Sequence, residues 1–227
     1  MERFFEVKAA IDKELKSFDV QKAIVERVGN VLQRNSSYDY IQTIDLLLSS
    51  MELINIQDSI QNICSTGISP DEVLKMVLTP EVLSKYAYVL IDCPPNLGLI
   101  TKNGLLISDG YVVPVVPQRM SVIGLSMIET QVKEYAQNKE KVIPLLGVVF
   151  TKVRRLSSYD SIKKNVCNRF GADVFKAEFN ENDAIGKAAE WQETGVAFGR
   201  RGRFCAGFCS GGWGIFGILS SDYQKEA

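Results

Sequence analysis

The chain has 227 residues, 46% of them hydrophobic, and 26 basic against 27 acidic side chains give a net charge of −1. That length and apolar content suffice for one large core or two small ones. The near-zero charge argues against a strongly basic nucleic-acid binder, although a local basic patch is compatible with it. Histidine is absent, which excludes histidine general bases, Ser-His-Asp triads and histidine metal sites.

Five cysteines lie at positions 64, 93, 167, 205 and 209. Their number is odd, no two form a CxxC pair and we find no secretory signal, so we expect reduced thiols in a cytoplasm. Cys205 and Cys209 alone are too few for a zinc site, which favours unliganded thiols.

The first part of the chain has mostly helical patterns. A helical stripe begins at Phe4, a second helical pattern continues to about Leu32, and residues 38–48 are typical of a strand. Two segments have the spacing of a capping box and predict helix starts. They are Ser49-Ser-Met-Glu52, followed by an apolar helical stripe from Leu53 to Ile63, and Ser69-Pro-Asp-Glu72, with Pro70 at the first helical position.

The run Tyr88-Val-Leu-Ile91 then ends in Asp92-Cys-Pro-Pro. It has no polar alternation and is rich in strand formers, which predicts a strand buried on both faces. Because proline cannot donate to a strand ladder, the strand should stop before Pro94. Asp92 is therefore expected at the carboxyl edge of a central strand, where a carboxylate suits hydrated Mg²⁺ and a nucleotide phosphate. The alternative is a solvated acid in a strand-to-loop turn.

Helices and strands alternate through the rest of the chain, which predicts a mainly parallel sheet flanked by helices on both faces, an α/β fold. We expect helices at 97–107, around Leu125, Ile128, Val132 and Tyr135, around Ile162, Val166 and Phe170, and at 183–193, with strands at 111–116, 142–150 and 174–179.

Several motifs occur in an order that resembles the ParA/Soj/MinD group of P-loop ATPases. That group has D-x-P-P-x-L-G, T-x-N, A-D, V-P-V and S-x-x-G-L in succession. Ile44–Leu53 is also similar to an upstream strand-plus-helix element, and Asn182–Glu190 to a late helix, so the resemblance covers roughly residues 38 to 197. The matching segments are Asp92-Cys-Pro-Pro-Asn-Leu-Gly98, Thr101-Lys-Asn103, Ser108-Asp109, Val113-Pro-Val-Val-Pro117 and Ser121-Val-Ile-Gly-Leu125.

The resemblance implies a P-loop NTPase-like fold and a cytoplasmic, nucleoid-associated bacterial or plasmid ATPase that segregates DNA or positions cargo. Such proteins form an ATP-dependent homodimer that binds DNA non-specifically and is switched off by a ParB-like partner. By position, Asp92 would hold Mg²⁺ through water. Pro117 and Gln118, with Thr151 and Lys152 after the next strand, would lie near the adenine of ATP, although Thr151 also suits a purely packing role. The resemblance assigns no catalytic residue.

The group's phosphate loop, K-G-G-x-G-K-T-T, has no counterpart in this sequence. In such a loop backbone N–H groups wrap the phosphates, a lysine neutralises charge and a threonine reaches Mg²⁺. Gly29 is the only glycine before residue 67 and forms no phosphate nest. We therefore expect residues 1–198 to form an N-terminally incomplete domain that lacks the first strand and the loop. ATP hydrolysis by such a chain is not expected, and strand edges exposed by the gap would favour pairing with another chain.

From residue 199 the composition changes to Gly, Phe, Cys and Trp behind Arg200-Arg201-Gly-Arg203. We interpret 199–227 as a divergent Gly-rich tail with little fixed structure. A membrane anchor is a weaker alternative, because the 18 uncharged residues 204–221 are short for a span and contain glycines. The three arginines offer a third interpretation, a phosphate contact.

Basic residues near the predicted strand 142–150 are candidates for DNA contacts, as the resemblance implies for this half of the chain. They are Arg154 and Arg155 after the strand, and Lys163 and Lys164 on the following helix. A solvated helix face is the competing interpretation. Two functions therefore stay open: a partition ATPase, or a non-hydrolysing relative that binds DNA, a partner protein or an intact ATPase subunit.

Overall fold

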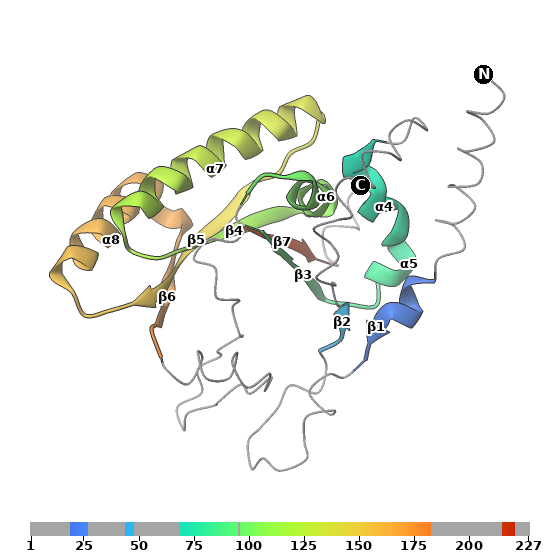
Figure 1. Cartoon of the computed structure of the whole chain (residues 1–227), viewed down its shortest axis with the longest axis horizontal. Helices are drawn as coiled ribbons and strands as arrows, with labels where there is room; N and C mark the ends of the chain where they lie inside the picture. Colours follow the sequence, from blue (N-terminus) through green and yellow to red (C-terminus); the bar gives the residue numbers. More distant parts are fainter. Residues whose placement is uncertain (1–18, 27–43, 48–68, 95, 183–214, 221–227) are drawn as a thin grey trace, which may run out of the picture.

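The computed structural model describes residues 19–26, 44–47, 69–94, 96–182 and 215–220, the last six by their backbone. A five-stranded sheet forms its centre, in the order β3-β7-β4-β5-β6, and a separate two-stranded sheet pairs β1 with β2 (Figure 1). The strands are β1 (Ile24–Val25), β2 (Leu46–Leu47), β3 (Tyr88–Cys93), β4 (Gly110–Val115), β5 (Leu145–Val153), β6 (Val174–Asn180) and β7 (Ile215–Ser220).

Four strands of the large sheet point the same way. β4 pairs in parallel with β5, and β5 with β6, whereas β7 is antiparallel to both β3 and β4. The carboxyl ends of β3, β4, β5 and β6 therefore meet at one edge of the sheet. This arrangement, with helices between the parallel strands, confirms the predicted α/β class.

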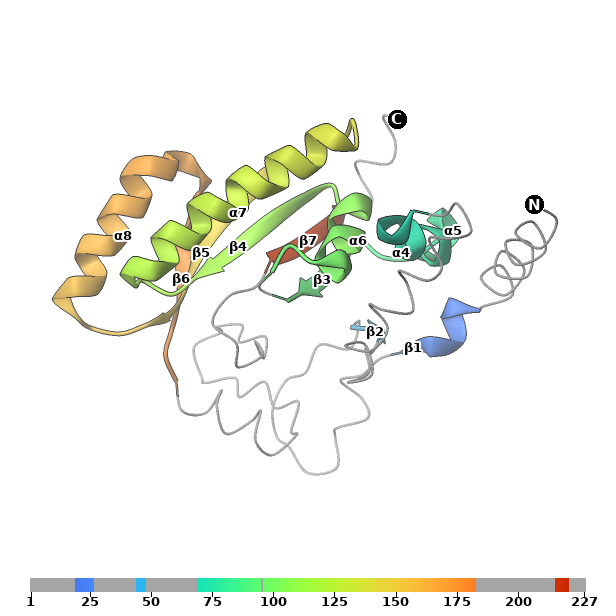
Figure 2. The same ribbon diagram turned by 45° about the horizontal axis from the view of Figure 1, so that its top comes forward.

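Three helices link these four strands: α6 (Leu99–Ile107), α7 (Arg119–Asn138) and α8 (Ser157–Phe170). All three crossovers advance in one direction across the sheet, so right-handed connections place the helices on one face, as Figures 1 and 2 show. The short segments η3 (Pro70–Glu72) and α4 (Val73–Val77) lie beside α6, and α5 (Pro80–Leu83) follows α4 on the side away from α6. The helices predicted within 1–18, at 53–63 and at 183–193 fall outside the described residues.

The core lies between this helical layer and strands β4 and β5. Leu105 of α6, Leu125 of α7 and Val166 of α8 meet Val113 and Val148 in one buried cluster, and each is at most 1% exposed. The predicted inward stripe of α7 is confirmed at Leu125, Val132 and Tyr135, which are buried, while Ile128 is half-buried.

The prediction that the Asp92 strand is central and buried on both faces is wrong. In the part of the chain that the structure describes, β3 lies at the edge of the sheet and its only ladder partner is β7. Tyr88 is 68% and Leu90 69% exposed on one face, while Ile91 and Cys93 pack toward α6 on the other. The physical reason is that every described crossover helix covers the same face. The strand ends at Cys93, before Pro94, as predicted.

The interpretation of the tail as lacking fixed structure is wrong for residues 215–220. They form β7, which pairs with all six residues of β3 and with Gly110, Tyr111 and Val112 of β4. A strand at these positions also contradicts a membrane helix across 204–221. The boundary predicted between residues 198 and 199 lies outside the described residues and stays a prediction.

Smaller corrections concern element ends. Residues 20–25 form a 3₁₀ turn, η1 (Val20–Ala23), and β1 rather than the predicted helix. Within the predicted strand 38–48, the described part is strand only at Leu46–Leu47. β5 begins at Leu145, three residues later than predicted, and Val142 is 84% exposed. A second 3₁₀ turn, η4 (Gly171–Asp173), precedes β6.

Candidate functional site at the carboxyl edge of the sheet

Asp92 lies next to last in β3, with its side chain on the exposed face of the strand. Partial burial against the sheet nevertheless raises the pKa of this carboxyl. Within the described part of the chain, no three acidic or cysteine side chains gather closely enough to hold a metal ion. Asp92 therefore supplies a single carboxylate, which suits contact with a hydrated cation through water.

The loop after β3 is held by the start of α6. Thr101 is fully buried, and its hydroxyl lies 2.6 Å from the Asn96 carbonyl oxygen and 3.3 Å from that of Pro94. The Asn96 side chain in turn accepts a hydrogen bond from the Gly98 N–H at 3.3 Å. The threonine of the T-x-N motif thus holds the chain directly behind Asp92, because a buried hydroxyl needs such partners, while Asn103 bonds to Pro70, Leu74 and Leu99 instead.

The residues predicted near adenine gather at the ends of β4 and β5. Val115 pairs with Phe150, so Pro117 and Gln118 follow one strand beside Thr151 and Lys152 at the end of the other. Pro117 is fully buried and Thr151 half-buried, which leaves Gln118 and Lys152 as the exposed members.

Lys152 has an unusual backbone. Its φ is +49°, in the left-handed region that non-glycine residues seldom adopt, and the pairing of β5 with β6 shifts between Phe150 and Val153. Such a bulge redirects the side chains at the end of a strand. It falls on the carboxyl edge, where bulges often adjoin binding sites.

β7 divides the predicted site into two parts. Because it lies between β3 and β4, Asp92 is two strand spacings, about 10 Å, from the β4–β5 group. β7 also runs antiparallel, so its first residue, Ile215, is the one beside Cys93 at this edge. A phosphate loop follows the carboxyl end of a strand. The carboxyl end of β7 lies beside Tyr88, at the edge of the sheet opposite to Asp92.

The described residues therefore do not by themselves fit a nucleoside triphosphate with its Mg²⁺. Among the predicted site residues, they provide the exposed carboxylate of Asp92 and the exposed polar side chains of Gln118 and Lys152, but no glycine-rich turn whose N–H groups could cradle phosphates. ATP and Mg²⁺ are expectations of the family resemblance that these residues meet only in part.

The four candidate DNA-binding residues divide into two pairs. Arg154 makes a two-pronged contact with Glu181, and Lys163 Nζ lies 2.6 Å from Glu178 Oε2. Arg155 and Lys164 are exposed and have no ion pair within the described part of the chain. Since paired charges are already neutralised, Arg155 and Lys164 are the better placed for phosphate contacts.

Sequence reasoning missed Tyr159, which is buried at the start of α8 and lies 3.4 Å by its hydroxyl from Gln118 Nε2. This long hydrogen bond links Gln118, beyond the end of β4, to the start of α8. The signal was available, because Tyr159 extends the apolar stripe Ile162, Val166 and Phe170 by one turn.

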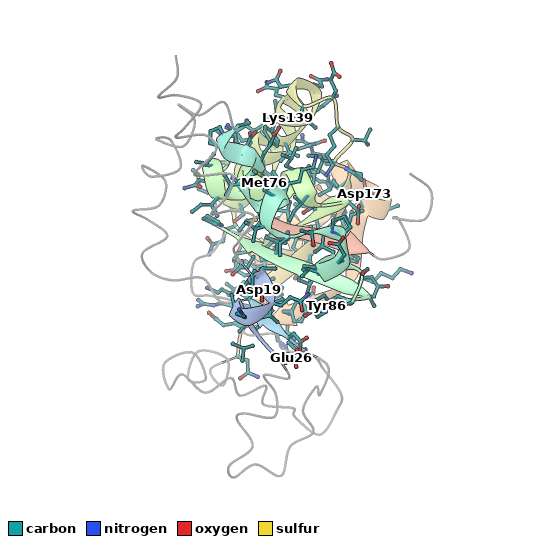
Figure 3. All side chains as sticks on the ribbon, turned by 90° about the vertical axis from the view of Figure 1, so that its right-hand side faces the viewer. Asp19, Glu26, Met76, Tyr86, Lys139 and Asp173 are labelled. Carbon is teal, nitrogen blue, oxygen red and sulfur yellow. The ribbon has the colours of Figure 1, made fainter. Side chains whose placement is uncertain are left out.

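A second unpredicted feature is a polar cluster where η3 meets α7. Asp71 is 7% exposed, accepts hydrogen bonds of 2.8 Å from both Lys139 Nζ and the Tyr135 hydroxyl, and is also bonded to Ser69. Figure 3 labels Lys139 at the end of α7. Burial opposes ionisation of Asp71, but its bonds to Lys139, Ser69 and Tyr135 outweigh burial and lower its pKa. Ser69 therefore binds Asp71 and makes no side-chain cap bond to η3, contrary to the predicted capping box.

The parallel strands and their crossover helices define a class: an α/β domain of the P-loop NTPase type. A family model described as an AAA domain matches residues 7–144, more than half of the chain. The chain belongs to the ParA/Soj-like family of P-loop ATPases.

Named relatives agree with this assignment. The chain is 30% identical over 159 residues to an uncharacterized protein of Mycobacterium tuberculosis, covering 69% of this chain and 46% of that protein. It is 29% identical over 147 residues to the chromosome-partitioning ATPase Soj of Treponema pallidum, covering 64% of this chain and 53% of Soj. The chain thus spans about half the length of the curated relatives it matches.

A solved structure supports the fold alone. The crystal structure of a plasmid partition protein from Borrelia burgdorferi superposes with a TM-score of 0.50 at 18% identity, covering 85% of this chain and 76% of that one. No helix in the described part combines the length and apolar content needed to cross a membrane.

Proposed function

We propose that this chain acts in DNA segregation or cargo positioning by binding DNA and a partner protein, without hydrolysing ATP on its own. Of the two functions that the sequence leaves open, this proposal adopts the second, a non-hydrolysing ParA-like protein. The observation that carries it is the antiparallel β7 beside Asp92, which leaves the described edge with a metal-type carboxylate and no phosphate cradle. Chromosome-partitioning relatives support the cellular role.

The competing candidate is an ATP-dependent partition ATPase that dimerises on Mg-ATP. The raised pKa of Asp92 favours it, since a partly desolvated carboxylate that has no ion pair among the described residues suits a metal position. In this version Asp92 holds Mg²⁺ through water, and Gln118, Lys152, Pro117 and Thr151 border the adenine.

Calorimetry with Mg-ATP on the whole chain separates the two candidates. We expect no binding at micromolar nucleotide, because several charge-assisted phosphate contacts are missing. Micromolar binding that disappears in Asp92→Ala would instead establish the ATP-dependent candidate.

DNA binding is tested through the two pairs of basic residues. In the variant Arg155→Ala/Lys164→Ala we expect affinity for random-sequence duplex to fall by about tenfold at low salt. The slope of log affinity against log salt concentration should become shallower by about two. The matched variant Arg154→Ala/Lys163→Ala removes the same charge but from residues paired with Glu181 and Glu178, so its loss should be smaller. Equal losses would show that ion pairing does not select the DNA contacts. Wild-type protein that binds no duplex at low salt would exclude the DNA-binding function.

The proposed partners are a second copy of the chain, non-specific DNA and a ParB-like activating protein, and the proposed location is the bacterial cytoplasm, associated with the nucleoid. These partners are those that the family resemblance implies, and the names of the chromosome-partitioning relatives support a role in partitioning. Fluorescence microscopy of a tagged chain tests the location: overlap with the nucleoid is expected, and uniform cytoplasmic fluorescence would contradict it.

A further inference from the structure

β7 occupies a space one strand wide between β3 and β4, which we call the β3–β4 slot (Figures 1 and 2). α6 joins β3 to β4 directly along the chain, whereas β7 comes from residues 215–220, beyond both β5 and β6. β7 is also antiparallel to both walls of the slot. The walls are thus built by neighbouring parts of the chain, while the strand between them comes from a distant part.

β7 pairs incompletely on the β4 side of the slot. It pairs with all six residues of β3, but only with Gly110, Tyr111 and Val112 of β4. The Tyr111 N–H donates to the Pro144 carbonyl, 3.0 Å away on the β5 side. Because successive residues of a strand direct their peptide groups to opposite sides, the Pro114 carbonyl faces the slot, beyond the part of β4 that pairs with β7. Within the described residues, the slot side of β4 is therefore unpaired toward the carboxyl edge.

The direction of the two walls determines what a strand in the slot brings to the carboxyl edge. β3 and β4 both point toward that edge, so a strand parallel to them would end between Asp92 and Pro117, one strand spacing, about 5 Å, from each. β7 brings its first residue to this edge instead. Both halves of the candidate site, which β7 separates, would adjoin the turn that follows a parallel strand.

The surroundings of the slot define the chemistry of such a segment. Every residue of β4 is buried and α6 covers one face of the slot, so the strand must be apolar. The turn after it must fit between the loops that follow β3 and β4 and leave its N–H groups free for an anion, which favours glycine. Asp92 is exposed and has no ion pair among the described residues, so a lysine in the turn would complement its charge.

We propose that the β3–β4 slot binds an apolar strand of a separate polypeptide, which displaces β7, runs parallel to β3 and β4 and continues into a glycine-rich turn that carries a lysine. Strand addition of this kind gains its affinity from main-chain hydrogen bonds. A second copy of these 227 residues does not supply the segment, because the sequence has no glycine-rich turn with a lysine. DNA and a ParB-like protein play no part in this contact either, so it goes beyond the proposed function.

Binding of a synthetic peptide to the whole chain is the first test. The fluorescent probe has a lysine tag for solubility, a Val/Ile strand of the same six-residue length as β3 and β4, and the turn K-G-G-V-G-K-T-T. We expect saturable binding at about 10 µM, measured by fluorescence anisotropy. A control peptide with proline at alternate strand positions lacks ladder donors and should bind at least about tenfold more weakly. Equal binding of the two peptides would overturn the proposal.

Hydrogen exchange tests whether the peptide replaces β7. The amides of residues 215–220 should exchange faster when the peptide is bound, because β7 leaves its ladders, while the amides of β3 stay protected. The control peptide should leave the exchange of β7 unchanged. Peptide binding without faster exchange of residues 215–220 would place the peptide outside the slot and contradict the proposal.

A weakened β7 should favour the peptide. Ile218 pairs with Leu90 on one side and Gly110 on the other, so its N–H belongs to one of the two ladders. Ile218→Pro removes that donor, and we expect about tenfold tighter peptide binding. The matched variant Ala177→Pro alters β6, at the far edge of the sheet, and should leave the peptide affinity unchanged. A folded Ile218→Pro chain with unchanged affinity would exclude competition with β7, and if this variant does not fold, hydrogen exchange of the parent chain decides.

Photo-crosslinking tests the direction of the bound strand. A photoreactive group on the first residue of the peptide's turn should label residues 92–94 or 116–118, as mapped by mass spectrometry. Labelling of residues 86–88 would make the peptide antiparallel and overturn its contact with the carboxyl edge. These measurements contain no DNA. A chain that binds the peptide but no duplex would therefore retain the strand-binding site and lack the DNA-binding function, and duplex binding without peptide binding would have the opposite meaning.

Discussion

Strands β3 and β4 have the same length and similar apolar composition but opposite surroundings. Every residue of β4 is buried, whereas β3 exposes Tyr88, Leu90 and Asp92 on one face. β4 is flanked by ladders to β5 and β7 and covered by α6 and α7. β3 has one ladder partner in the described part and is covered on one side. Burial here follows position in the sheet, and the candidate metal residue lies on the less buried strand.

The largest expected difference in stability comes from placing a carboxylate in β4 and, for comparison, in β3. Val113→Asp puts an unpaired carboxylate at a position that is 0% exposed, and we expect it to destabilise the fold by more than about 4 kcal/mol. Leu90→Asp makes the same change at a position 69% exposed and should cost less than about 0.5 kcal/mol. Urea unfolding of both variants measures the difference. Similar losses would mean that the outer face of β3 is covered in solution.

The next effect concerns the polar cluster that joins η3 to α7. Asp71→Ala removes the carboxylate that lies 2.8 Å from both Lys139 Nζ and the Tyr135 hydroxyl, and it leaves Lys139 only the 3.5 Å ion pair with Glu72. We expect a loss of about 2–3 kcal/mol in the free energy of unfolding. The double variant Asp71→Ala/Lys139→Ala should recover part of this loss, since it also removes the lysine charge that loses Asp71, although Glu72, 3.5 Å from Lys139, then loses its ion pair.

The same cluster predicts a pH dependence. The pKa of Asp71 is lower in the folded chain than its ordinary value of 3.8. Its stabilising contribution is therefore complete above pH 3.8 and disappears as the pH falls through the lower, folded-state pKa. Unfolding curves at successive pH values should show a steeper acid loss for wild type than for Asp71→Ala. Parallel curves would exclude Asp71 as a source of acid sensitivity.

The sequence predicted the β4–α7–β5–α8 half well, because there local pattern and surroundings agree. The stripe of α7 and the end of β3 before Pro94 depend on periodicity and on the missing N–H of proline, and both are local properties. The predicted burial of Leu90 required knowledge of where β3 lies in the sheet, which its own composition does not contain.

The other limit on prediction from the sequence was contact between residues that lie far apart in the chain. Nothing in residues 215–220 specifies an antiparallel position between β3 and β4, because an uncharged Gly-containing segment suits several environments. Likewise, Asp71 meets Lys139 and Tyr135 across more than 60 residues of sequence. The motif around Asp92 fixed its place at the carboxyl edge, while the partners of Gln118 and Arg154 depended on the fold.

A smaller effect tests how firmly β3 is held against α6. A methyl group at Gly104 would lie 3.0 Å from Cys93 Sγ and 3.2 Å from Ile91 Cγ2. We expect Gly104→Ala to destabilise the fold by about 1 kcal/mol, since this crowding exceeds the gain in helix propensity. Thermal unfolding checks the sign. A stabilised variant would show that β3 can shift away from α6 at little cost, so that β3 would be packed less tightly than β4.

The smallest effect is expected at Asp92. Its pKa is raised by partial burial, so ionisation disfavours the folded state above that pKa, and the penalty is relieved as the pH falls through the ordinary value of 3.8. Because the side chain is exposed, solvent screening limits the penalty to a few tenths of a kcal/mol. Asp92→Asn should therefore be slightly more stable than wild type at pH 7 and equal to it near pH 3. Unfolding at both pH values, with and without Mg²⁺, measures this difference. If millimolar Mg²⁺ stabilises wild type but not Asp92→Asn, the carboxylate is a metal position, whereas equal responses would make Asp92 an ordinary solvated acid at the edge of the sheet.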